Sequence, residues 1–135
     1  MNIETIGIVG QGFVGGAIRE GLKDYYNIAT YDKFVREKST CSTLSELTDK
    51  AIILFACLPT PMKKTGECDI SIIDEVLGEI NDCANGNLVV IKSTIPPGTS
   101  RMFTEKYKNI SVVFNPEFLR EKTANEDFIN QNRIV

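Results

Sequence analysis

Three glycines near the N-terminus have the spacing that is needed to hold a phosphate-rich ligand. Gly10, Gly12 and Gly15 form a Gly-x-Gly-x-x-Gly pattern directly after a short apolar run. In this pattern the first glycine allows a tight turn, the second lets the backbone approach a pyrophosphate, and the third lets a helix pack closely on a strand. The free N–H groups and the dipole at the start of that helix attract phosphates. This glycine loop, residues 10–15, therefore predicts a dinucleotide site.

An acidic residue extends this prediction to the ribose. Asp32 ends the next apolar run, about 20 residues after the second glycine, where a carboxylate accepts ribose hydroxyls. A 2′-phosphate would meet this carboxylate as a like charge, so NAD is favoured over NADP, although Lys33 and Arg36 lie close enough to soften the preference. A glycine-rich turn without a ligand is the alternative, which the flanking strand and helix disfavour. The loop residues expected to contact NAD are Gly10, Gln11, Gly12, Phe13, Val14 and Gly15.

Apolar runs alternate with helix-like patterns along the chain, and these elements must position the glycine loop. Strands are expected at 5–9, 27–31, 51–57, 88–92 and 111–114, with the start of a sixth strand at 133–135. Helices are expected at 13–24, 44–48, around 70–80, at 99–108 and at 119–127. Such alternation predicts an α/β fold, namely a Rossmann-type doubly wound parallel sheet of five to six strands in a single domain.

Length and composition restrict the class of protein further. The 135 residues suit one compact domain, and no apolar stretch is long enough to cross a membrane. The net charge of −3, without a basic run, argues against nucleic acid or a membrane surface as a partner. Because the chain has no histidine, acid–base work would fall to Glu, Asp, Lys, Cys or water. The four cysteines form no C-x-x-C pair, which argues against a metal site and favours reduced, structural thiols in the cytoplasm.

Three later loops follow predicted strands at the edge where parallel sheets bind their ligands. The first runs over residues 58–61, the second over residues 92–99, and the third over residues 115–121. All three should line one cleft together with the glycine loop.

These loops and the glycine loop together resemble the N-terminal NAD-binding domain of the nucleotide-sugar 6-dehydrogenases, the UDP-glucose/GDP-mannose dehydrogenase family. The resemblance extends from Ile6 to Val135, and its most specific segment is Asn-Pro-Glu-Phe-Leu-Arg-Glu at 115–121. Lys-Ser-Thr at 92–94, with Pro-Gly-Thr at 97–99, is nearly as specific. The family oxidises the C6 alcohol of a UDP- or GDP-linked sugar to the acid with two NAD. The resemblance therefore implies an oxidoreductase of polysaccharide biosynthesis whose partner is a nucleotide sugar, and a homo-oligomer stays open.

The resemblance also implies roles for residues of the later loops. NAD would be contacted by Leu58, Pro59, Thr60, Pro61, Ser93, Thr94 and Glu121. The sugar site would take Glu117, Phe118, Leu119, Arg120 and Glu121. Thr94 would help to hold a catalytic water, and Glu117 would be the acid–base residue that hydrolyses a thioester intermediate. The alternatives are caps at Thr94 and Glu117 and a solvated surface charge at Glu121.

Two features depart from the family pattern. The family's nucleophilic cysteine lies in a later domain, and no cysteine here has that motif; Cys57 ends an apolar strand and is expected in the core. The connection from Asp32 to Leu58 is also shorter than is usual in the family.

We therefore expect one NAD-binding domain at 1–135, without the central and UDP-sugar-binding domains, that binds NAD without full turnover. A stand-alone dinucleotide-binding module with a sensing or partner-binding role is the alternative. The 115–119 segment disfavours a 6-phosphogluconate or hydroxyacid dehydrogenase.

Overall fold

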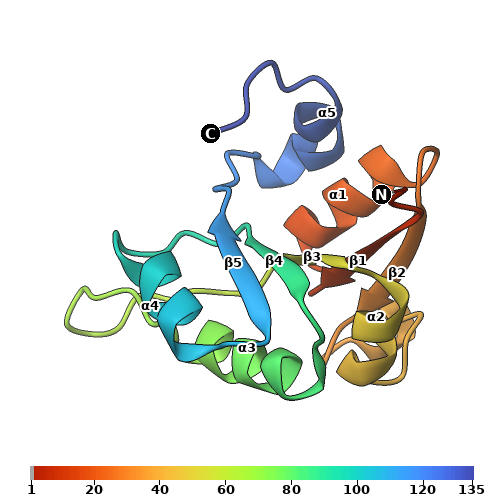
Figure 1. Cartoon of the computed structure of the whole chain (residues 1–135). Coiled ribbons are helices and arrows are strands. Elements are labelled where there is room, and N and C mark those ends of the chain that lie inside the picture. The colour runs from red at the N-terminus through yellow and green to blue at the C-terminus, as the bar shows by residue number, and fades with distance from the viewer. Residues whose placement is uncertain (1) are drawn as a thin grey trace.

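Parallel strands form the centre of the chain in the computed structural model, which describes residues 2–135 (Figure 1). The sheet has five strands in the order β2-β1-β3-β4-β5, and every neighbouring pair is parallel. The strands are β1 (Thr5–Val9), β2 (Asn27–Tyr31), β3 (Ile53–Ala56), β4 (Asn87–Ile91) and β5 (Ile110–Phe114). The predicted α/β class with a parallel sheet is confirmed.

Helices cover both faces of this sheet (Figure 1). They are α1 (Phe13–Leu22), α2 (Leu44–Lys50), α3 (Ser71–Cys83), α4 (Thr99–Lys106) and α5 (Ala124–Ile129), with short 3₁₀ helices η1 (Arg36–Lys38) and η2 (Glu121–Thr123). Helices α2, α3 and α4 enclose the larger hydrophobic core, whereas α1 and α5 enclose a smaller one. Among residues 2–135, none of the helices combines the length and the apolar character that a membrane crossing requires.

Most of the strand and helix positions that the sequence predicts are found within a few residues of their expected ends. The prediction of a sixth strand is wrong, because residues 133–135 have no regular structure and are exposed. A strand of three residues would form only a few hydrogen bonds with its neighbour, and these would not offset the conformational entropy that is lost when the residues are ordered. The Asn115 side-chain amide instead donates a hydrogen bond to the Val135 backbone oxygen at 2.7 Å.

The order of the strands places a crevice at the middle of the sheet. From β1 the chain moves outward to β2, and then crosses back to place β3 on the other side of β1. In open α/β sheets, ligands bind outside the carboxyl ends of the strands where the order reverses in this way. The glycine loop leaves the carboxyl end of β1, so the fold places it at this point.

Candidate cofactor site

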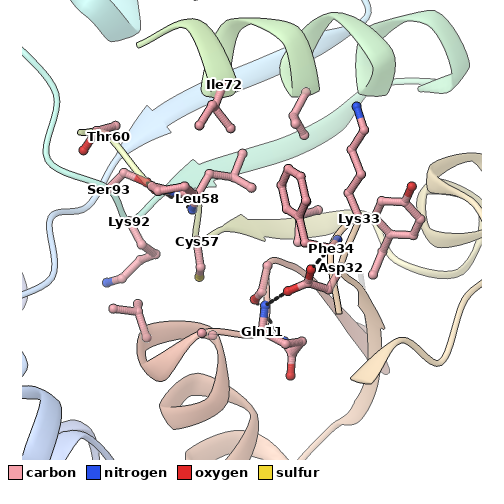
Figure 2. A pocket seen from close by; sticks show the side chains of 18 of the residues that line it. Gln11, Asp32, Lys33, Phe34, Cys57, Leu58, Thr60, Ile72, Lys92 and Ser93 are labelled. Carbon is pink, nitrogen blue, oxygen red and sulfur yellow. Dashed lines mark hydrogen bonds between the residues drawn. The ribbon is translucent and has the colours of Figure 1, made fainter. Parts of the chain in front are cut away.

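A cleft of about 500 Å³ opens at the carboxyl ends of the strands, beside the glycine loop (Figure 2). One side is formed by the glycine loop and the residues after β2, and the other by the loops after β3 and β4. Helix α3 closes the cleft from above in Figure 2. The opening is therefore bounded by segments that lie far apart in the sequence.

The glycines of the loop are required by close backbone contacts and by an open space. Gly10 has φ of 91°, and a Cβ added there would overlap the Cys57 carbonyl oxygen. A Cβ added at Gly15 would overlap the Gly10 carbonyl oxygen. A Cβ added at Gly12, by contrast, would meet no atom within 4 Å. The first and third glycines therefore hold the loop together, and the second leaves room for a ligand.

The start of α1 is suited to a phosphate. Its N-cap residue, Gly12, provides no side-chain cap, and the first turn contains no acidic residue. The first intrahelical bond runs from the Gly16 N–H to the Gly12 carbonyl at 2.9 Å, so the N–H groups of residues 13–15 have no helical acceptor. Such free donors and the helix dipole form an anion site. The residues present therefore fit the pyrophosphate of a dinucleotide.

Asp32 is held beside this loop by backbone donors. One carboxylate oxygen accepts the Gln11 N–H at 2.8 Å, and the other accepts the N–H groups of Phe34 and Val35, each at 2.8 Å. Burial acts to raise the pKa of Asp32, but these three donors and the charge of Lys38 outweigh it, so the pKa lies below its ordinary value. The carboxylate is therefore ionised, fixed in orientation and exposed to the cleft on its remaining side.

Replacing Asp32 with asparagine is expected to lower the free energy of unfolding by about 2 kcal/mol at neutral pH. In asparagine one of the two accepting oxygens becomes an NH₂ group, which cannot accept a hydrogen bond from a backbone N–H. Since the folded-state pKa lies below the unfolded value, the ionised carboxylate stabilises the fold fully above about pH 4 and less as the pH falls through the folded pKa. Urea unfolding of both chains should therefore show a constant difference from about pH 8 to 5 and a smaller one below about pH 4. Asp24→Asn, on the exposed surface, is the control. A difference that already shrinks near pH 7 would contradict this account.

The loop after β4 is tied to the loop after β3. The Ser93 hydroxyl donates to the Leu58 carbonyl oxygen at 2.5 Å and accepts the Leu58 N–H at 3.2 Å. Both residues line the cleft, together with Pro59, Thr60 and Thr94. This pair of hydrogen bonds holds the two loops as one wall.

A buried ion pair lies at the far end of the cleft. The ammonium of Lys92 is 3.2 Å from Glu117 Oε2, and the two side chains are only 5% and 7% exposed. The hydrogen bond of the ammonium goes to Asn115 Oδ1 at 2.6 Å, while the Phe118 N–H donates to Glu117 Oε1 at 2.9 Å. Glu117 Oε2 has no hydrogen-bond partner within residues 2–135. The charge of this buried oxygen is therefore balanced by Lys92, while Glu117 itself belongs to the lining of the cleft.

The Cys57 thiol borders the same end of the cleft (Figure 2). Burial raises its pKa to about 12, with the Lys92 charge opposing the rise and the Glu117 charge adding to it. Cys57 packs against the smaller core, as its apolar strand suggested. All four cysteines are unpaired, and no group of three or more His, Cys, Asp or Glu side chains in residues 2–135 is placed to hold a metal ion.

The structure brings most of the residues selected from the sequence to this one cleft. Those that line it are Gly10, Gln11, Gly12, Phe13, Val14, Gly15, Asp32, Leu58, Pro59, Thr60, Ser93, Thr94, Glu117 and Leu119. The others, Pro61, Phe118, Arg120 and Glu121, are exposed and lie outside its lining. Glu121 borders a separate hollow with Phe13 and Arg19, and the Arg120 side chain pairs with Asp127 at 2.8 Å.

Several lining residues were not selected from the sequence. Among them are Ile72, Glu75, Val76 and Glu79, on α3. Lys92, directly after β4, was expected in the lining but without a role of its own. Lys92 had a usable signal, since a charge ends an otherwise apolar strand. The α3 residues recur at helical spacing and so share one face, but only the tertiary structure indicates that this face meets the cleft.

A parallel sheet with a glycine loop at the reversal of strand order, and a carboxylate after the second strand, defines a Rossmann-type dinucleotide-binding domain. Residues 18–135 match the family model described as "UDP-glucose/GDP-mannose dehydrogenase family, NAD binding domain". The chain belongs to this family, and NAD is its cofactor. The resemblance inferred from the sequence is thereby confirmed.

Two relatives are much longer than this chain. It is 36% identical over 108 residues to an uncharacterized protein of Methanocaldococcus jannaschii, covering 76% of this chain and 12% of the relative. It is 41% identical over 87 residues to the UDP-glucose 6-dehydrogenase of Rickettsia bellii, covering 61% of this chain and 20% of the relative. The chain thus spans a fifth or less of the length of these relatives.

Solved structures show the same fold. A UDP-glucose dehydrogenase from Pyrobaculum islandicum matches with a TM-score of 0.86 and 23% identity, over 98% of this chain and 40% of that one. A 3-hydroxyisobutyrate dehydrogenase from Mycobacterium tuberculosis matches with a TM-score of 0.74 and 15% identity, over 93% and 44%. Because dehydrogenases of different names share this fold, the family assignment rests on the sequence match.

Proposed function

We propose that this chain is the NAD-binding unit of a nucleotide-sugar 6-dehydrogenase, which oxidises the C6 alcohol of a UDP- or GDP-linked sugar to the acid. The observation that carries the proposal is the position of Glu117, whose buried carboxylate lies at the same cleft as the glycine loop. A module that only bound a dinucleotide would not need a buried carboxylate at this place. Family membership supports the same reaction.

The residues of the cleft would share the work as follows. The N–H groups at the start of α1 would bind the pyrophosphate, and Asp32 would accept ribose hydroxyls. The wall formed by Leu58 and Ser93 would contact the middle of the cofactor and exclude water. When bound, NAD supplies the acceptor for the hydride that leaves the sugar carbon.

Hydrolysis of a thioester intermediate would fall to the far end of the cleft. Glu117 lines the cleft as a carboxylate paired with Lys92, so it could take a proton from a water there, and Thr94 lines the same cleft and could hold that water. The thiol for the covalent step would have to come from elsewhere in the enzyme, because Cys57 keeps its proton at neutral pH. Residues 118–121 would extend toward the sugar.

The test is to measure NAD binding and sugar oxidation with the purified chain. Isothermal titration should show saturable NAD binding at one site per chain. Mixtures with NAD and UDP-glucose or GDP-mannose should show no sustained rise in NADH absorbance, since no cysteine of this sequence lies in the family's nucleophile motif. Absence of NAD binding would refute the role as a cofactor unit, and sustained turnover would refute the need for a further part.

A further inference from the structure

A lysine at the mouth of the cleft is held by two glutamates of α3. Lys33 directly follows Asp32, and Figure 2 shows its side chain extending from the segment after β2 toward α3. Its ammonium lies 2.9 Å from Glu75 Oε1 and 3.4 Å from Glu79 Oε1. All three side chains line the cleft, on the side of the ribose-binding carboxylate. The contact therefore joins two segments across the region where the adenosine half of a dinucleotide would lie.

The other two nearby cations are also engaged. The Arg36 guanidinium lies over the Tyr31 ring, 5.4 Å from its centroid, and donates to the Ser42 carbonyl oxygen at 3.1 Å. The Lys38 ammonium donates to the Gln11 carbonyl oxygen at 3.3 Å. Neither of them lines the cleft. Of Lys33, Arg36 and Lys38, therefore, Lys33 is the cation that a ligand in the cleft would meet beside Asp32.

A 2′-phosphate needs a free cation next to the ribose. It carries close to two negative charges at neutral pH and is bound best by a Lys or Arg that donates charge-assisted hydrogen bonds. Here the lysine next to Asp32 already has two carboxylate partners, and those carboxylates would themselves repel the phosphate. NAD has a hydroxyl at this position and meets no such repulsion.

We propose that Glu75 and Glu79 are specificity-determining residues for the cofactor. They occupy Lys33 and add their charges to that of Asp32, so that the cleft rejects NADP by two independent elements, one after β2 and one on α3. This inference rests on the proposed binding of NAD in the cleft. It assigns to α3 a role that the glycine loop and Asp32 do not explain.

The test compares affinities for NAD and NADP, with 5′-ADP and 2′,5′-ADP as a second pair of probes that lack nicotinamide. Glu75→Gln/Glu79→Gln should raise the affinity for NADP by about tenfold, because Lys33 becomes free, and leave that for NAD within about twofold. The fold should be preserved, since exposed ion pairs contribute little to stability. Adding Lys33→Gln to this variant should remove the gain.

Glu4→Gln/Glu105→Gln is the matched control, because it removes the same charge from exposed positions outside the lining of the cleft. It should leave the ratio of the two affinities unchanged. The proposal would be overturned if Glu75→Gln/Glu79→Gln raised the affinity for NADP no more than the control does. It would also be overturned if the rise persisted after Lys33→Gln was added. A wild-type chain that fails to bind NAD or 5′-ADP would instead refute the cofactor site itself, so the two failures are distinguishable.

Discussion

Replacing Gly10 with alanine is expected to lower the free energy of unfolding by about 2–5 kcal/mol and to abolish NAD binding. Two effects add at this position. The backbone has φ of 91°, which L-residues with a Cβ rarely adopt, and the new methyl group would overlap the Cys57 carbonyl oxygen. Relief of this overlap would separate the ends of β1 and β3, which carry the two walls of the cleft. Urea unfolding and NAD titration measure the two losses.

Two other glycines provide the controls. Gly86 has φ of 80° but open space around an added Cβ, so Gly86→Ala isolates the backbone effect and should cost only about 1–2 kcal/mol. Gly12→Ala should leave stability nearly unchanged, because its φ is −71° and no atom lies within 4 Å, yet it should weaken NAD binding by filling the cleft. Equal stability losses in Gly10→Ala and Gly86→Ala would show that the contact with Cys57 is unimportant.

Replacing Lys92 with methionine is expected to cost about 3–5 kcal/mol of stability at neutral pH. Methionine preserves much of the volume of the side chain but leaves the Glu117 carboxylate buried without its counter-charge. It also removes the donor to Asn115 Oδ1. Since desolvating an unpaired charge is far more costly than desolvating a neutral group, most of the loss should come from Glu117. Chemical unfolding at neutral pH measures it.

A second substitution and an exposed pair test this explanation. Lys92→Met/Glu117→Gln should recover much of the lost stability, because the buried charge is removed together with its partner. Lys50→Met breaks the exposed pair with Glu46, which has a shorter distance of 2.7 Å, and should cost less than about 1 kcal/mol. If Lys92→Met behaved like Lys50→Met, the ion pair at the cleft would not be a buried one in solution.

Local patterns were sufficient for most elements of the fold. Strand β1 and helix α1 begin at the predicted residues because an apolar run, a glycine turn and helical spacing follow each other without conflict. The C-terminal segment was harder: residues 119–120 are not helical, and the helix that follows ends at Ile129. There the sequence has no strong apolar period, and a short 3₁₀ turn precedes α5, with Arg120 paired to Asp127 across it.

By itself, the amino-acid sequence determined the parallel α/β architecture, because strand and helix patterns alternate along the chain. It also determined the glycine loop and the place of Asp32, because both depend on spacing along a short stretch of the chain. Only the tertiary structure decided which side chains meet across segments. It paired Glu117 with Lys92 and Lys33 with α3, and it placed Glu121 outside the lining of the cleft. These contacts depend on how strand ends and helix faces come together in space, and no local periodicity encodes a distance between residues that lie far apart in the sequence.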